Sequence, residues 1–194
     1  MTGSELNNIV AAIDIGTTKI VAIIGKKDST GKIEIMGYGR AESTGVKRGV
    51  VLNIEQTVNA IREAVAKAEN EAKVTITEAY VGIAGQHIRS MRNRGYINRD
   101  SYDEEISRED VQALIDDMYK IPIDVGEEII HVLPQNYIVD SESGIKSPVG
   151  MFGKRLEANF HIVIGQTAAA NNLKKCVNRS NIKVRKLILE PLAS

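Results

Sequence analysis

The fold of this chain is decided by residues 9–25, which read IVAAIDIGTTKIVAIIG. Two apolar segments, each typical of a buried strand, flank the turn Gly16-Thr17-Thr18, and the first segment carries one carboxylate, Asp14. A charged side chain in an apolar strand is costly unless it has a partner. Because Asp14 lies just before the turn, we expect its partner to be a bound cation, held directly or through water.

The turn itself has the chemistry of a phosphate site. Gly16 allows close approach of the backbone, Thr17 and Thr18 supply hydroxyl and N–H donors, and Lys19 adds a positive charge. One charge pair near a protein surface is worth roughly 4 kcal/mol at a separation of ~4 Å, so a single lysine can change nucleotide affinity. The alternative is an ordinary hairpin turn, since aspartate and glycine favour turns in many contexts.

The flanking pattern favours the phosphate interpretation. A third strand is predicted over 33–39 after a turn at 28–31, followed by a helix that begins near Asn53 and a strand over 78–85. Strand, Asp-Gly-Thr turn, strand, hairpin and third strand resembles the opening of the actin and sugar-kinase ATPase fold. That fold holds phosphate in such a hairpin.

The rest of the chain alternates between helical and extended patterns. Beyond residue 86 the predicted elements are a helix starting at Ser107 and ended by Pro122, extended segments over 128–134 and 135–140, a loop over 141–155, a strand over 158–165, a helix over 167–179 and a strand over 183–189. Residues 86 to about 165 therefore form a predicted α+β insertion. The last helix and strand resume the α/β pattern of the first part.

Composition excludes several classes of protein. The chain has 194 residues, 43% of them hydrophobic, with 25 basic and 25 acidic residues, so no overall charge favours nucleic acid or a membrane surface. Aromatic residues make up only 4%, which argues against a base-stacking surface. The single cysteine, Cys176, suits a reducing compartment and a buried helix position. We expect a soluble cytoplasmic protein that does not bind nucleic acid.

Four motifs, in order, resemble the FtsA family of actin-like cell-division proteins. They are DIGTTK at 14–19, AYVGIAGQHI at 79–88, HVLPQNY at 131–137 and GIKSPVGM at 144–151. The first motif is shared with actin and the heat-shock-chaperone ATPases, whereas the other three are particular to FtsA. The resemblance covers nearly the whole chain.

This resemblance implies an α/β fold, in which an actin-like (ribonuclease-H-like) subdomain carries an inserted α+β domain of the SHS2 type. Residues 1–84 would form the first part of subdomain 1A with the phosphate hairpin, 85–165 the inserted 1C domain, and 166–194 a truncated return to subdomain 1A. It also implies a longer parent protein, which adds a second phosphate motif, an adenosine pocket, an FtsZ-binding subdomain and a membrane-anchoring amphipathic helix.

The resemblance also assigns residues to a nucleotide site. The implied cofactor-binding residues are Asp14, Gly16, Thr17, Thr18 and Lys19. Asp14 would lie near a magnesium ion and contact it through water. Glu190 falls where related ATPases place an acid near the attacking water, although such a position equally suits an acid that starts a helix.

The implied function is that of a cell-division actin homologue. Such a protein binds ATP with magnesium, assembles head to tail with itself, links FtsZ filaments to the inner membrane and recruits later division proteins through 1C. It acts at the inner face of the cell membrane at the division site, and its ATPase activity is weak or absent. We expect this chain alone to bind ATP weakly or not at all, because it offers one phosphate hairpin and no adenine pocket.

Two other functions are compatible with the same fold. One is a type IV pilus-assembly adaptor ATPase, which can share the 1C-like insertion. The other is a small-molecule kinase of the same superfamily, which would need a catalytic aspartate aimed at a substrate hydroxyl. No such carboxylate is visible outside the phosphate hairpin.

The insertion has an uneven charge pattern. Residues 86–99 contain no acid, whereas 100–117 is strongly acidic. The arginines of the basic segment are Arg89, Arg92, Arg94 and Arg99. They either pair with the acidic segment, at under ~1 kcal/mol for each exposed pair, or form a contact surface for a neighbouring subunit or a partner protein.

Overall fold

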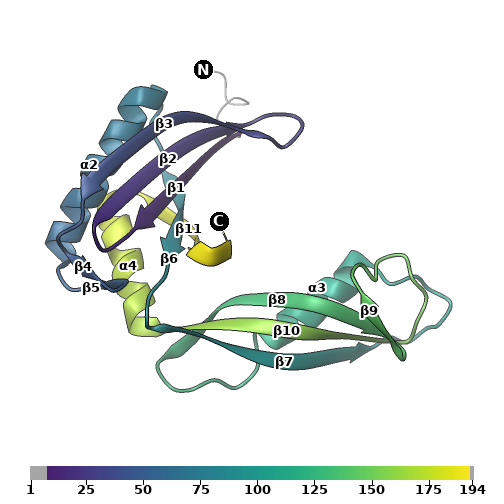
Figure 1. Ribbon diagram of the computed structural model, residues 1–194. Coiled ribbons are helices and arrows are strands. Elements are labelled where there is room, and N and C mark those ends of the chain that lie inside the picture. Colours follow the sequence, from purple (N-terminus) through teal and green to yellow (C-terminus); the bar gives the residue numbers. More distant parts are fainter. Residues whose placement is uncertain (1–7, 193–194) are drawn as a thin grey trace. The chain divides into compact units, whose positions relative to one another are not determined.

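The computed structural model describes residues 8–192, and the chain forms two compact units. The first unit comprises the residues up to His87 together with those from Gln166 onward, and the second comprises Ile88–Gly165. Each unit has its own sheet (Figure 1). No helix within the described range is both long enough and apolar enough to span a membrane.

The first unit is built on a five-stranded sheet in the order β11-β6-β1-β2-β3. Its strands are β1 (Ile9–Ile15), β2 (Lys19–Lys27), β3 (Ile33–Glu42), β6 (Glu78–Ile83) and β11 (Lys183–Leu189). Neighbours among β1, β2 and β3 are antiparallel, whereas β6 is parallel to both β1 and β11. The carboxyl ends of three parallel strands therefore meet at one end of the sheet, where α/β proteins bind ligands.

Helices α2 (Ile54–Ala72) and α4 (Thr167–Arg179) lie on one face of this sheet (Figure 1). Helix α2 begins at Asn53, whose side chain accepts the N–H of Gln56 at 3.1 Å. It lies very close to β3: a Cβ added to Gly39 would be only 1.8 Å from the Ala64 carbonyl oxygen. Only glycine permits this approach, so the helix and the strand are held in one register.

Two short elements complete the first unit. Strands β4 (Val46–Lys47) and β5 (Val50–Val51) form a small hairpin between β3 and α2. A 3₁₀ turn, η1 (Glu190–Leu192), directly follows β11. It lies where the sequence indicated that another helix was starting.

The second unit is a four-stranded sheet in the order β7-β10-β8-β9, with one helix against it. Its elements are β7 (Ile88–Asn98), α3 (Arg108–Met118), β8 (Glu127–Val139), β9 (Glu142–Ile145) and β10 (Arg155–Gln166). Helix α3 starts with a capping box in which Ser107 and Asp110 each accept the other's backbone N–H. Its Leu114 packs into a core with Leu156 and Phe160, all essentially buried.

The α/β class with an inserted α+β unit, predicted from the sequence, is confirmed. The main differences lie in the second unit, where the two predicted extended segments are the single strand β8. Pro134 lies inside this strand and does not end it. Strand β9 itself lies in the predicted loop.

Candidate functional site

Two carboxylates meet at the carboxyl ends of the parallel strands in the first unit. Asp14 is the last residue but one of β1, Glu190 directly follows β11, and Gly82 lies near the end of β6. A Cβ on Gly82 would be 3.3 Å from Asp14 Oδ1 and 3.5 Å from Glu190 Cγ. The two side chains therefore converge on this glycine, in a pocket of about 410 Å³ that Tyr80 and Ile188 also line.

This carboxylate pair fits a cation. Burial raises the pKa of Glu190, and the negative charge and hydrogen bonding of Asp14 raise it further. Asp14 Oδ1 is buried without a hydrogen-bond partner among residues 8–192. A buried oxygen that lacks a donor is costly, and carboxylate oxygens are the usual protein ligands of magnesium, which keeps several of its waters. The residues present therefore suit Mg²⁺, held by Asp14 directly or through water.

The turn between β1 and β2 lies next to this pair along the chain. The Gly16 N–H donates to the Lys19 carbonyl oxygen at 3.0 Å, which closes the hairpin. The three residues that follow Gly16 are all exposed. The hydroxyls of Thr17 and Thr18 and the ammonium group of Lys19 are therefore accessible to a phosphate group.

A second hairpin supports the first. The backbone N–H of Arg48, in the turn between β4 and β5, donates to Thr17 Oγ1 at 3.1 Å. Arg48 and Gly49 have φ values of 51° and 80°, as a two-residue hairpin turn requires. Gly49 packs so closely on Ala84 that a Cβ would meet its carbonyl oxygen at 1.9 Å. Sequence reasoning missed Arg48, and the signal that could have found it is an Arg-Gly pair between two valine-containing segments.

The four arginines proposed as a contact surface have different surroundings in the second unit. Arg89 pairs with Glu127 and, at 3.4 Å, with Asp124. Arg94 pairs with Glu157 at 2.7 Å. Arg92 is exposed and makes no ion pair with any residue in the described part of the chain.

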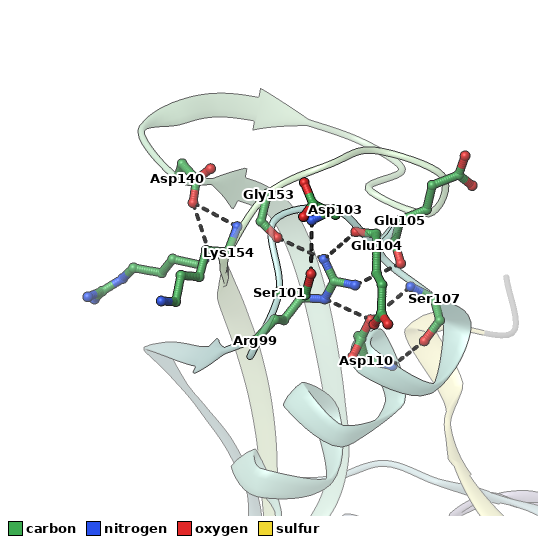
Figure 2. A network of polar contacts seen from close by, with 11 residues as sticks. Arg99, Ser101, Asp103, Glu104, Glu105, Ser107, Asp110, Asp140, Gly153 and Lys154 are labelled. Carbon is green, nitrogen blue, oxygen red and sulfur yellow. Dashed lines mark hydrogen bonds and ion pairs between the residues drawn. The ribbon is translucent and has the colours of Figure 1, made fainter.

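Arg99 lies inside the second unit, where its side chain is only 7% exposed (Figure 2). Its Nε donates to Asp110 Oδ2 at 3.0 Å, and its terminal nitrogens donate to the carbonyl oxygens of Glu104, Glu105 and Gly153. Arg99 thus joins the segment before α3 to the segment before β10. Within residues 8–192 it is the only one of the four arginines that pairs with an acid of the 100–117 segment.

Comparisons with known proteins identify the second unit and place the chain among similar sequences. Residues 85–164 match the family model described as the SHS2 domain inserted in FtsA. Over its full length the chain is 38% identical to the cell division protein FtsA of Pseudomonas aeruginosa, of which it spans 46%. Over 95% of its length it is 40% identical to the FtsA of Neisseria meningitidis, of which it spans 44%.

A solved structure of a PilM–PilN type IV pilus biogenesis complex superimposes on 95% of the chain with a TM-score of 0.64. The aligned region spans 48% of the chain in that structure, and the sequence identity is 9%, so the similarity concerns the fold alone.

The fold and the matched domain define this chain as an actin-like α/β protein with an inserted SHS2 domain. The resemblance to FtsA is confirmed, because the similarity to FtsA proteins extends over nearly the whole chain and includes the inserted domain. The chain spans somewhat less than half the length of these relatives.

Proposed function

We propose that this chain supplies the phosphate and magnesium side of the nucleotide site in an actin-like cell-division protein. The observation that carries the proposal is the meeting of Asp14 and Glu190 over Gly82, at the carboxyl ends of three parallel strands. Within the described part of the chain, the Asp14 side chain has a buried oxygen without a donor, and an exposed turn rich in donors directly follows it.

Each residue has a distinct role in this proposal. Gly16, Thr17 and Thr18 donate to the phosphate oxygens of ATP, and Lys19 neutralises part of their charge. Asp14 holds the hydrated magnesium ion, which when bound supplies positive charge beside the phosphates. Glu190 faces the same pocket and, when ionised, can accept a proton from a water there, which is the role of a general base.

The affinity of this chain for ATP is expected to be low. It contributes one phosphate hairpin, and the relatives it resembles are more than twice as long. An adenosine pocket and a second phosphate motif would come from the rest of such a protein. Nucleotide would then act mainly as a ligand that stabilises one conformation, with weak hydrolysis or none.

The similarity to FtsA supports a wider proposal for the whole protein. In it the protein assembles head to tail, links FtsZ filaments to the inner membrane, and recruits later division proteins through the 1C domain, residues 85–165. It works at the inner face of the cell membrane at the division site. The sequence similarity to cell division proteins favours this role over that of a pilus adaptor or a kinase.

A titration of the isotope-labelled chain with MgATP, followed by amide chemical shifts, tests the nucleotide site. NMR detects millimolar binding, so it suits the low affinity expected. Shifts should concentrate at residues 14–19, at Gly82 and at Arg48. They should fall when magnesium is chelated, and Lys19→Ala should weaken binding by about tenfold, as expected for the loss of roughly 1.4 kcal/mol.

A matched control is Lys27→Ala, which removes a cation from the opposite end of β2. It should leave the titration unchanged. No shift at millimolar MgATP, or shifts that are as large in the second unit as in the turn, would contradict the proposal.

A further inference from the structure

The β7 strand has one open side along its whole length. It contains 11 residues and stands at the end of the sheet order β7-β10-β8-β9, so its ladder partner is β10 (Figure 1). The register pairs Asn98 with Arg155 at one end and Ile88 with Gly165 at the other. An edge strand of this length is a template for pairing with another extended segment.

One hydrogen bond shows which residues of β7 turn their backbone outward. The Arg94 N–H donates to the side chain of Asn93 at 2.8 Å, and not to the backbone of β10. In a strand, alternate residues direct their N–H and C=O groups to the same side. The outward groups therefore belong to the even-numbered residues, Ile88, Ser90, Arg92, Arg94, Tyr96 and Asn98.

A groove lies beside this edge. It has a volume of about 680 Å³, and its polar lining includes Arg92, Arg94, Gln135, Asn136, Asn159 and His161. Arg92 is opposite His161 in the β7–β10 register, and Arg94 is opposite Asn159. The residues of β10 that alternate with these, among them Phe160 and Ile162, are buried in the core under α3. The groove is thus on the sheet face away from the helix.

The charge of the edge determines what can pair with it. Arg94 is already bound to Glu157, whereas Arg92 has no acidic partner among the residues that the structure places. Residues 86–99 contain no acid that would repel an acidic strand or compete with it. Two copies joined through β7 would bring their arginines together, which is destabilising. An acidic strand would instead meet the Arg92 guanidinium group, and arginine is well suited to bind a carboxylate in a bidentate manner.

We propose that β7 receives an extended acidic peptide segment of a partner protein as an added strand, with one of its carboxylates in the groove against Arg92. The backbone of the even-numbered residues supplies affinity, and the groove supplies specificity. The amides of Asn136 on β8 and Asn159 on β10 bond to each other at 2.8 Å and form the far side of the groove. This inference is independent of nucleotide binding in the first unit.

The test begins with selection of peptides from a random 12-residue phage-display library on the purified chain. Enriched sequences should carry aspartate or glutamate at alternating positions. A synthetic peptide of the enriched sequence should slow hydrogen exchange at the amides of Ser90, Arg92 and Tyr96, whereas the Arg94 N–H is already bonded to Asn93. Absence of acidic enrichment, or protection that lies elsewhere, would overturn the proposal.

Three variants test the charge of Arg92, the backbone pairing of β7 and the specificity of the site separately. Arg92→Glu should weaken the acidic peptide by at least about tenfold, as for loss of a charged hydrogen bond, and should select basic peptides instead. Ser90→Pro removes one outward N–H without touching the arginines, and it should also weaken binding. Lys146→Glu makes the same charge change at an exposed site outside β7 and should have no effect.

Exchange protection of the β10 amides reports whether each variant is folded. Equal binding by Arg92→Glu and the unaltered chain would refute the role of charge. Sedimentation of the chain alone provides the last control. A dimer that Ser90→Pro abolishes would assign the edge to a second copy and overturn the assignment to an acidic partner.

Discussion

Replacing Asp14 with asparagine should stabilise the first unit when magnesium is absent. Asp14 and Glu190 both lie within 3.5 Å of the point that a Cβ on Gly82 would occupy, so their charges are only a few ångströms apart. Two like charges at ~4 Å repel by roughly 4 kcal/mol at an effective dielectric constant of 20. Both side chains are partly exposed, and solvent screening reduces this to about 1 kcal/mol.

The same substitution should flatten part of the dependence of stability on pH. The pKa of Glu190 is raised in the folded protein, so between its ordinary value and its raised value the folded state binds more protons than the unfolded state. Stability therefore falls as pH rises through this window. Asp14→Asn removes the part of the rise in the Glu190 pKa that Asp14 causes, whereas the part caused by burial remains. The fall in stability with pH should therefore become smaller without disappearing.

Thermal unfolding with a magnesium chelator present, measured between about pH 4 and 8, provides the assay. A gain of about 1 kcal/mol corresponds to a rise in Tm of roughly 2–4 °C for a chain of this size. Asp28→Asn is the control with the opposite sign. Asp28 accepts hydrogen bonds from the Thr30 hydroxyl and from the N–H groups of Thr30 and Lys32, which lower its pKa.

The stabilisation from Asp28 is present above its ordinary pKa and is lost as pH falls through the lowered value. Asp28→Asn should therefore lower Tm at neutral pH. A drop in Tm for Asp14→Asn like that of this control would rule out repulsion between Asp14 and Glu190, because it would show that Asp14 stabilises the fold without a cation.

Three further predictions concern the two cores. Arg99→Met should destabilise the second unit by roughly 3–5 kcal/mol in urea unfolding, because three carbonyl groups lose their donor and the Asp110 carboxylate keeps the Ser107 N–H but loses its cationic partner. Gly39→Ala should destabilise the first unit by about 1–3 kcal/mol or more in the same assay, since its Cβ would overlap the Ala64 carbonyl oxygen. Cys176 is fully buried, and burial raises the pKa of its thiol. The thiol should therefore react with an aromatic disulfide reagent only after denaturant is added. Rapid labelling of the native chain would contradict the buried placement of Cys176.

The order of the elements could be predicted because long apolar patterns specify them locally. The helix expected over 167–179 and the strand over 183–189 have the predicted bounds. Strand β9 could not be found in this way, since its four residues have no apolar alternation and are held by pairing with β8.

The candidate site was predictable only along the chain. Asp14 and the turn that follows it are adjacent in sequence, so a phosphate and cation site at this place could be proposed from the sequence. The approach of Glu190 to Asp14 depends on β6 lying between β1 and β11, which no local pattern states. The arginines show the same limit, because Arg99 is buried by contacts such as that with Gly153, 54 residues away, while Arg92 stays exposed.

The proposed nucleotide site depends on the Asp14–Glu190 pair being the cation site beside the phosphate turn. Paramagnetic broadening of amide signals by MnATP tests it most directly, because Mn²⁺ replaces Mg²⁺ and broadens only nearby nuclei. We expect broadening around Asp14, Gly82 and Glu190, and we expect Asp14→Asn to reduce it greatly. Broadening centred elsewhere, or unchanged by that substitution, would contradict it.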